Sequence, residues 1–271
     1  MIGGRDGWLL DNRDANVDRA PSPELQANIG RLIAAIQAQG VVVVLPVFPA
    51  RALVAAQYLD EPQPGESTFD AAVAQKRHDE LLGWLRGTGA TVLDMLAPAL
   101  SIREPPYFYL RRDHHVTPTG TKLAAEAVAT AIRAKGIVLP SLPTTATPAG
   151  TRSLRDEGRL KMVETYCGES PAPPEAYTIW KVTSERPTLD LVSDVGPAKV
   201  VLVGTSISGR PFQFPEFLSD ALDADVLGVF TTAGGILSAL QEYLRSPEWQ
   251  ASRPTVLVWE FAHSELFRAE L

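Results

Sequence analysis

KVVLVGTS, residues 199–206, is an apolar run that ends in glycine, threonine and serine. A short run of aliphatic and β-branched residues without polar alternation is typical of a strand that helices cover on both faces. Ligands of open α/β sheets bind beyond the carboxyl ends of the strands, which is where this stretch would place Ser206. The stretch therefore predicts a parallel sheet with a functional serine at its edge, although a serine that only caps the next helix would give the same pattern.

Four further runs have the same character and predict the remaining strands: Val41–Phe48, Thr91–Met95, Asp225–Thr232 and Thr255–Ala262. Amphipathic helical patterns accompany them, at Ser22–Gln39, Phe69–Arg86, Thr117–Lys135 and in the segments that start at Phe214 and Ile236. Strands that alternate with amphipathic helices predict a three-layer α/β/α domain around a five-stranded, doubly wound parallel sheet of the flavodoxin-like type.

Residues 139–196 interrupt this alternation, because they are rich in proline, threonine and charge. Only Tyr177–Val182 reads as a strand there. We expect an irregular insertion, with room for a small hairpin, that joins two halves of one domain spanning residues 1–271.

The overall composition restricts the possible functions. With 45% hydrophobic and 21% charged residues the chain can bury a sizeable core, and its net charge of −7 argues against a nucleic-acid partner. No apolar run reaches the roughly 18 residues of a membrane-spanning helix, and no signal-peptide pattern is visible at the start. Cys167 is the single cysteine, which excludes an internal disulfide and leaves no cysteine-based metal cluster.

A second motif, Asp113-His114-His115, lies in a polar loop just before the helix that begins at Thr117. A carboxylate two residues from an imidazole can accept the Nδ1–H of His115 and leave Nε2 to take a proton from a hydroxyl. With Ser206 this predicts a triad of nucleophile, base and orienting acid. A metal site at His114 and His115 lacks further ligands at a recognisable spacing, and a solvated polar loop is the other alternative.

Other candidates lie near the ends of the remaining strands. Gly234 and Gly235 could donate backbone N–H groups to an oxyanion, together with the N–H of Ser206, or could form a simple tight turn. Ser208 is an alternative nucleophile, two residues farther from its strand. Glu260 and His263 could line the same rim, although a surface histidine without a role would give the same sequence.

Together these motifs resemble the SGNH hydrolase superfamily, in particular its alginate O-acetyltransferase branch with an SGNH hydrolase-like domain. The matching segments are Gly4–Leu9 (GRDGWL), Val44–Val47 (VLPV), Asp113–His115 with Thr117, Pro118 and Gly120, Gly204–Ser206, Gly234–Gly235, and Trp259–Glu260. The Asp-x-His block precedes Ser206 here, whereas most members of the superfamily have the serine first. The resemblance therefore implies a circularly permuted motif order, with Ser206, His115 and Asp113 as the triad.

Two positions depart from the family pattern. Val116 stands where the branch has a tryptophan after the histidine, so we expect looser packing behind His115. The asparagine that many SGNH hydrolases use as an oxyanion donor is not evident near Glu260. The backbone N–H groups of Ser206, Gly234 and Gly235 are therefore the candidate donors.

The resemblance implies a serine-dependent O-acetyltransferase that uses no cofactor or metal and modifies an exported polysaccharide, in the periplasm or at the cell surface. Its partners would be the polysaccharide acceptor and an acetyl donor, such as a membrane acetyl-transfer protein. Arg51 and Arg112 are candidates for binding an acidic polysaccharide. A carbohydrate acetylesterase with the same triad and a non-catalytic polysaccharide-binding or scaffold protein are the alternatives.

Overall fold

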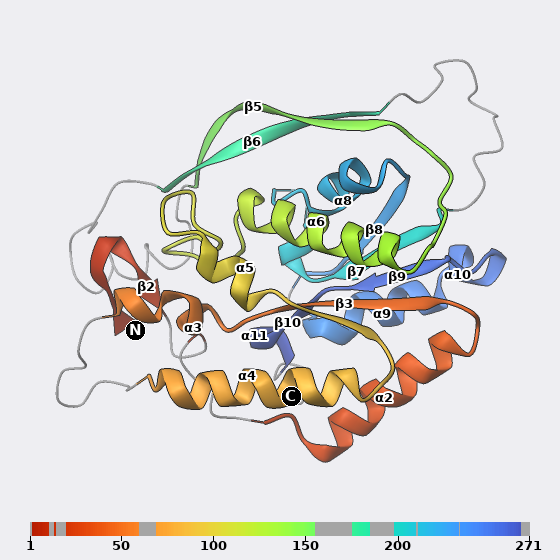
Figure 1. Cartoon of the computed structure of the whole chain (residues 1–271), viewed down its shortest axis with the longest axis horizontal. Helices are drawn as coiled ribbons and strands as arrows, with labels where there is room; N and C mark the ends of the chain where they lie inside the picture. Colours follow the sequence, from red (N-terminus) through yellow and green to blue (C-terminus); the bar gives the residue numbers. More distant parts are fainter. Residues whose placement is uncertain are drawn as a thin grey trace.

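The computed structural model describes residues 2–10, 14, 20–59, 69–154, 175–184, 198–209, 211–232 and 234–266. At its centre lies a parallel sheet with the strand order β4-β3-β9-β7-β8 (Figure 1). The strands are β3 (Val42–Phe48), β4 (Thr91–Asp94), β7 (Val200–Gly204), β8 (Val226–Phe230) and β9 (Val256–Trp259). This α/β architecture confirms the predicted fold class.

The strand count differs slightly from the prediction. The run Thr255–Ala262 is broken at Glu260, so that a short strand β10 (Phe261–Ala262) follows β9 and pairs in parallel with the end of β3. The sheet therefore has six strands within the described residues, not five. At the break, the side chain of Glu260 is fully buried and accepts hydrogen bonds from Thr205 in the turn after β7.

Helices cover both faces of the sheet, as Figure 1 shows. The helices are α2 (Pro23–Gln37), α3 (Arg51–Ala55), α4 (Ala71–Arg86), α5 (Leu96–Ser101), α6 (Pro118–Ala134), α8 (Phe214–Leu222), α9 (Gly235–Arg245), α10 (Pro247–Ala251) and α11 (His263–Leu266). α6 and α8 share one apolar core with Leu202 of β7, whereas α2, α4 and α9 share the other with Val203. Successive strand residues thus enter opposite cores, which explains why the strand sequences are continuously apolar.

The longer helices begin where the sequence supplies a cap. Ser22 accepts a hydrogen bond from the N–H of Leu25 at 3.2 Å at the start of α2. Thr117 accepts one from the N–H of Gly120 at 3.1 Å at the start of α6. In both helices a proline occupies the first turn, where a missing N–H costs nothing. The cap at Thr117 also determines where the loop that carries His115 ends.

The described residues of the segment 139–196 are less irregular than its composition predicts. The structure shows a long antiparallel ribbon of β5 (Thr144–Leu154) and β6 (Glu175–Ser184), which lies over α6 and α8 (Figure 1). Tyr177–Val182 is part of β6 as predicted, and the ribbon stands where the prediction left room for a small hairpin, although no strand was predicted at β5. A register shift between Pro148 and Gly150 accommodates the proline in the ribbon.

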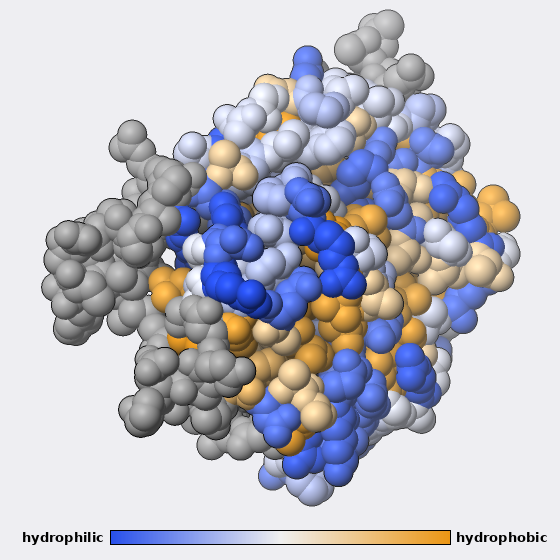
Figure 2. Space-filling model, turned by 60° about the vertical axis from the view of Figure 1, so that its left-hand side comes forward, coloured by the Kyte–Doolittle hydropathy of each residue, from blue (hydrophilic) through white to orange (hydrophobic). Residues whose placement is uncertain are grey.

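The N-terminal segment forms a small hairpin of β1 (Ile2–Gly3) and β2 (Leu9–Leu10). Two short 3₁₀ helices, η1 (Arg5–Gly7) and η2 (Ala56–Tyr58), lie nearby. The space-filling view shows hydrophobic side chains between hydrophilic areas on one face of the molecule (Figure 2). Within the described residues, no helix combines the length and the apolar character that crossing a bilayer requires.

Candidate active site

Ser206 lies in a tight turn directly after β7. The turn is the 3₁₀ helix η3 (Ser206–Ser208), which starts at the carboxyl end of the strand. Gly204 is required just before it, because an added Cβ would collide with Ser208 and with Glu260. The strand and the turn therefore bring the Ser206 hydroxyl to the edge of the sheet where α/β proteins bind ligands.

Glu260 anchors this turn from inside the protein. Its carboxylate accepts hydrogen bonds from the backbone N–H of Thr205 at 3.2 Å, from the hydroxyl of Thr205 at 2.6 Å and from the hydroxyl of Ser208. Glu260 and Ser208 are both fully buried. Ser208, the alternative nucleophile, is therefore buried and bound to a carboxylate, whereas Ser206 faces His115.

His115 connects Ser206 to Asp113. Its Nε2 lies 2.8 Å from the Oγ of Ser206, and its Nδ1 is hydrogen-bonded to Oδ1 of Asp113. The same carboxylate oxygen accepts the backbone N–H of His115 at 2.9 Å, which fixes the loop. Residues 91 positions apart in the sequence thus form one continuous hydrogen-bonded chain. The arrangement can move a proton from a serine hydroxyl to an imidazole whose tautomer is set by a carboxylate.

The charge of Asp113 suits that role. Burial raises the pKa of Asp113, but the hydrogen bond from His115 and the nearby charges of His115 and His114 outweigh this effect, so the pKa lies well below its usual range. The carboxylate therefore remains ionised at neutral pH. An ionised acceptor next to Nδ1 stabilises the imidazolium that forms when His115 takes a proton.

The amino-acid sequence of the chain matches a known protein family. Residues 1–263 match the family model described as "SGNH hydrolase-like domain, acetyltransferase AlgX". The chain belongs to this family.

Curated AlgX and AlgJ proteins are among the similar sequences. Alginate biosynthesis protein AlgX of Pseudomonas fluorescens is 29% identical over 286 residues, which cover 100% of this chain and 56% of that protein. Probable alginate O-acetylase AlgJ of Pseudomonas putida is 28% identical over 270 residues, which cover 96% of this chain and 69% of that protein. This chain thus spans little more than half the length of the AlgX relative.

A solved AlgX structure has the same fold. The structure of Pseudomonas aeruginosa AlgX superimposes with a TM-score of 0.81 at 27% identity, covering 96% of this chain and 62% of that chain. This agreement over nearly the whole chain is consistent with its membership of the AlgX family.

The ring of His115 is well packed although Val116 replaces the family's tryptophan. Phe212, which follows η3 in the chain, stacks on the imidazole with a centroid distance of 4.6 Å and an interplanar angle of 18°. Val116 itself is fully buried and packs against Gly120, where an added Cβ would collide with it. The looser packing expected behind His115 is therefore not seen.

Arg51 and Arg112, the candidates for binding an acidic polysaccharide, are both buried. Arg51 is 2% exposed and donates to the carbonyls of Leu9, Leu110 and Arg111 and to the carboxylate of Asp14. Arg112 is 4% exposed, and its Nε donates to a carbonyl of the N-terminal segment. Both guanidinium groups hold backbone carbonyls of loops, which sequence alone does not reveal.

Gly234 and Gly235 lie at the start of α9, the helix that follows β8 in the chain. β8 is the neighbour of β7 in the sheet, so this helix start and Ser206 lie at the same end of adjacent parallel strands. Gly235 has φ of +64°, a conformation that favours glycine, and a Cβ on Gly234 would collide with Ser238. The position fits N–H donors for an oxyanion, a role that remains a proposal.

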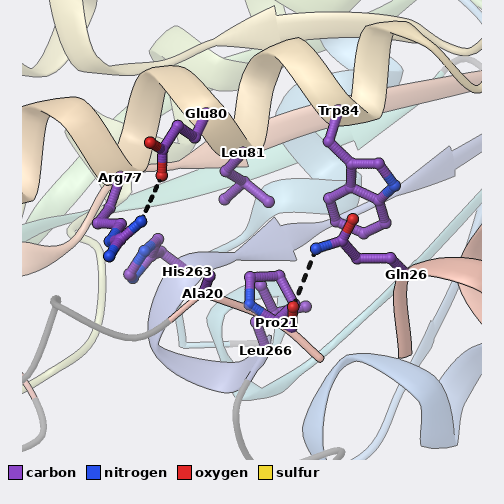
Figure 3. A pocket seen from close by; sticks show the side chains of 9 residues that line it. All are labelled: Ala20, Pro21, Gln26, Arg77, Glu80, Leu81, Trp84, His263 and Leu266. Atoms are coloured by element: carbon purple, nitrogen blue, oxygen red, sulfur yellow. Dashed lines mark hydrogen bonds and ion pairs between the residues drawn. The ribbon is translucent and has the colours of Figure 1, made fainter. Parts of the chain in front are cut away.

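Glu260 and His263 do not line the same rim. His263 is buried and lines a separate pocket of about 240 Å³ with Arg77, Trp84 and Leu266, among other residues (Figure 3). Burial, followed by the charge on His78, lowers the pKa of His263 to about 4. None of the triad residues lines this pocket, so it is not part of the candidate active site.

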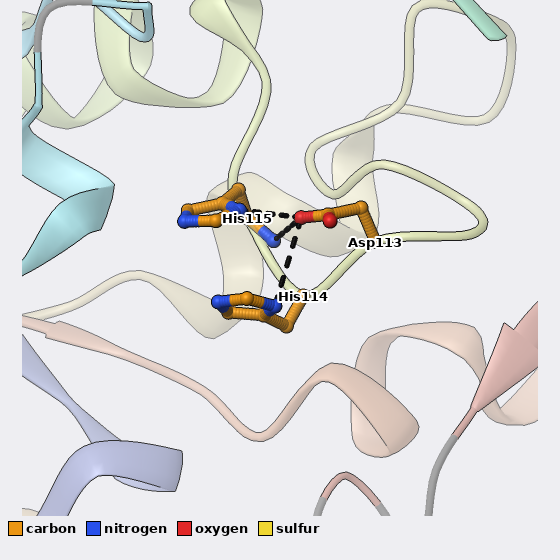
Figure 4. A group of neighbouring side chains, drawn as sticks. All are labelled: Asp113, His114 and His115. Atoms are coloured by element: carbon orange, nitrogen blue, oxygen red, sulfur yellow. Dashed lines mark hydrogen bonds and ion pairs between the residues drawn. The ribbon is translucent and has the colours of Figure 1, made fainter. Parts of the chain in front are cut away.

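Asp113, His114 and His115 form a compact group of possible metal ligands within the described residues (Figure 4). In this structure, however, the nitrogen atoms of His115 already have partners, because Nδ1 is bonded to Asp113 and Nε2 to Ser206. A metal ion would have to replace the hydrogen bonds that connect the triad. The geometry therefore favours proton transfer over metal binding.

Sequence reasoning missed three residues that hold the site. Phe212 packs on the imidazole of His115, Glu260 secures the serine turn, and Glu175 of β6 accepts the backbone N–H of Arg111 at 2.7 Å. Glu260 was predicted only as a residue of the rim. No local pattern marks the other two, because their partners lie far away in the chain.

Proposed function

We propose that this chain is an O-acetyltransferase that modifies an exported polysaccharide through an acetyl-enzyme at Ser206. The observation that carries the proposal is the continuous chain from Asp113 through His115 to Ser206, with 2.8 Å between Nε2 and Oγ. Membership of the AlgX family and the names of the AlgX and AlgJ relatives support acetyl transfer as the reaction. An acetylesterase would use the same triad with water as the acceptor.

In the first half of the reaction, Ser206 takes the acetyl group from the donor. His115 removes the hydroxyl proton with Nε2 while Oγ attacks the acetyl carbonyl carbon. The bond between that carbon and the leaving oxygen of the donor then breaks, and the imidazolium returns the proton to that oxygen. Asp113 keeps Nε2 directed at the serine throughout and stabilises the imidazolium.

In the second half, a sugar hydroxyl takes the place of the departed donor. His115 accepts the proton of that hydroxyl, the sugar oxygen attacks the acetyl carbon, and the bond to Oγ of Ser206 breaks as Oγ regains the proton. The negative oxygen formed in both halves needs backbone donors, for which Ser206, Gly234 and Gly235 are our candidates. Loss of one such donor costs on the order of 10²–10³ in rate.

Alginate is the acceptor that the names of the relatives suggest, and an exported polymer places the reaction outside the cytoplasm. An acetyl donor in the membrane would supply the group. The acetyl transfer itself needs no positively charged side chain at the acceptor, since the reacting groups are a neutral hydroxyl and an ester.

The test compares acetyl transfer by the wild type and by Ser206→Ala, with p-nitrophenyl acetate as donor and an oligomannuronate as acceptor. We expect wild-type protein to release nitrophenol and to acetylate the sugar. The rates of both reactions should be at least about 10³-fold lower in Ser206→Ala. Ser101→Ala is the matched control, because Ser101 is an exposed serine of α5 that donates a hydrogen bond to the nearby carbonyl of Pro98.

The products distinguish the alternatives. Acetyl groups on the oligosaccharide, found by mass spectrometry, support the transferase. Free acetate alone, at a rate that depends on Ser206, would favour the esterase. Turnover that is unchanged in Ser206→Ala would contradict both enzymatic proposals and leave a binding or scaffold protein.

A further inference from the structure

The imidazole of His115 lies against two other rings. His114 lies 3.9 Å away between ring centroids and Phe212 lies 4.6 Å away. The ring of Phe212 is nearly parallel to the imidazole, with an interplanar angle of 18°, so these two rings stack face to face. The ring plane of His115 is therefore set by packing as well as by its two hydrogen bonds.

Phe212 is itself held by the ribbon. It is 4% exposed and belongs to a small apolar cluster with Leu110, Tyr177 and Ile179, separate from the two main cores. Tyr177 of β6 is 3% exposed and contacts the ring of Phe212 at a centroid distance of 6.5 Å. A buried ring surrounded in this way has little freedom to turn.

The backbone next to Phe212 is fixed by the same strand. Gln213 donates from Nε2 to the carbonyl of Trp180 at 2.8 Å and accepts the N–H of Trp180 at 3.1 Å. This pairing of one side chain with both backbone groups of a β6 residue holds Gln213 at a φ of +58°. Thr121 of α6 completes the support by donating to the carbonyl of Phe212 at 2.5 Å.

The start of β6 reaches the other half of the site. Glu175 accepts the backbone N–H of Arg111 at 2.7 Å and its Nε at 3.4 Å. Arg111 precedes Asp113 by two residues, so this carboxylate holds the loop that carries Asp113 and His115. One strand thus contacts the loop before the histidine and the loop after the serine.

We propose that β6 positions the triad, and that Phe212 is a positioning residue that keeps Nε2 of His115 directed at Ser206. The inference rests on the proposed function, because it concerns the geometry of that reaction. Phe212 does not contact the reacting atoms in this role. It restricts the imidazole to the plane in which the Asp113 and Ser206 hydrogen bonds are both made.

The expected effect is a loss of turnover without a matching loss of substrate binding. Phe212→Leu removes the ring face, so we expect kcat for acetyl transfer to fall about 10- to 100-fold, whereas KM changes less than about threefold. Phe212→Tyr keeps the ring and should recover most of kcat. Tyr177→Leu should lower kcat in the same direction through Phe212, and it provides a second test if Phe212→Leu does not fold.

Phe217→Leu is the matched control. Phe217 is a buried phenylalanine of α8 that packs against Trp180 of β6. Its truncation should lower the melting temperature about as much as Phe212→Leu and leave kcat near the wild-type value. A second signal is the Nδ1–H proton resonance of His115, which should broaden or shift in Phe212→Leu and remain in Phe217→Leu.

Three results would overturn the inference. The first is wild-type kcat in both Phe212→Leu and Tyr177→Leu, and the second is an equal loss of kcat in Phe212→Leu and Phe217→Leu. The third is a folded Phe212→Tyr variant that does not recover activity. Measuring Ser206→Ala in parallel distinguishes a failure of this inference from a failure of the proposed function. If Ser206→Ala is inactive and both Phe212→Leu and Tyr177→Leu are fully active, only the role of β6 is wrong. If Ser206→Ala is fully active, the proposed reaction fails.

Discussion

The contacts of Asp113 keep its carboxylate ionised although the side chain is partly buried. Its carboxylate is partly buried, a position that by itself would favour the neutral acid. Hydrogen bonds from the side chain and the backbone N–H of His115 reverse that preference and hold the pKa below its usual range. The same contacts therefore fix the loop, the tautomer of His115 and the charge state.

Replacing Asp113 with asparagine should remove the charge and keep the shape. The amide can donate to Nδ1 of His115, which favours the tautomer with the proton on Nε2, and it cannot stabilise an imidazolium. We expect kcat on p-nitrophenyl acetate to fall about 10³- to 10⁴-fold with little change in melting temperature.

Asp79→Asn is the control for Asp113→Asn, since Asp79 is an exposed acid of α4 that hydrogen-bonds to Gln75. Its activity should equal that of the wild type. An Asp113→Asn variant within about tenfold of wild-type kcat would show that His115 does not need this carboxylate.

At the scale of elements, the turn after β7 depends on an unusual arrangement of polar groups in the core. Glu260 breaks the last strand and places its carboxylate under the serine turn, where Thr205 and Ser208 donate to it. A buried carboxylate needs such donors, because leaving it without hydrogen bonds costs several kcal/mol. Thr205 and Ser208 of the turn and Glu260 at the strand break therefore depend on one another through these hydrogen bonds.

Gly204→Ala tests this arrangement. The new methyl group would collide with buried atoms of Ser208 and Glu260, neither of which can move into open space. We expect the free energy of unfolding, measured with urea, to fall by about 1–3 kcal/mol, and transfer activity to fall with it. Gly83→Ala in α4 is the control, since no atom lies within 4 Å of its added Cβ and the helix should gain about 0.5–1 kcal/mol. Equal stability of the two variants would contradict the packing described here.

Elements with a strong local pattern were predicted, and elements that depend on distant partners were not. The continuous apolar run of β7 and the cap and proline at the start of α6 are local signals, and both elements are present. β5 has a composition typical of loops, and its pairing comes from β6, whose sequence lies more than twenty positions away. The buried positions of Arg51 and Arg112 likewise depend on carbonyls of distant loops.

The proximity of Ser206 and His115 was predicted from motif order and family resemblance rather than from any local pattern. The two motifs lie at the carboxyl side of the same sheet, and the structure places their side chains in hydrogen-bonding distance. Phe212 and Glu175, which hold that geometry, carry no signal in a single sequence. Packing around a site is thus harder to predict than the reacting groups themselves.

At the scale of the whole molecule, acid reaches the core beneath α4 through a buried histidine, His263. In the same core the buried His78 pairs with the partly exposed Asp94, with 2.8 Å between Nε2 and Oδ1. Beside the other core, Arg51 forms a buried ion pair with Asp14 and lies over the ring of Trp8. Acid should therefore destabilise the fold in part through His263, in the core beneath α4.

His263 gives this expectation a definite pH window. Its pKa is about 4 in the folded protein, whereas a histidine in an unfolded chain has a pKa near 6.5. Between these values the unfolded state binds a proton that the folded state does not, so stability is complete above about pH 6.5 and declines as the pH falls toward 4. We expect this residue to account for about 2–3 kcal/mol of the loss between pH 7 and pH 4.5.

Urea unfolding of wild type and His263→Gln at the two pH values measures that contribution. The variant should lose about 2–3 kcal/mol less than the wild type on acidification. Identical pH dependence in both proteins would show that His263 is protonated in the folded state and that the α4 core is more open to solvent than this structure indicates.

In the proposed reaction, an acetyl group passes through Ser206 on its way to a sugar. The most direct measurement is an acid quench during turnover of p-nitrophenyl acetate, followed by intact-mass analysis and peptide mapping. We predict one acetyl group per chain, located on the peptide that contains Ser206, absent in Ser206→Ala and discharged when an oligomannuronate is added before the quench. An acetyl group on any other residue, or steady transfer to the sugar by Ser206→Ala, would contradict the mechanism.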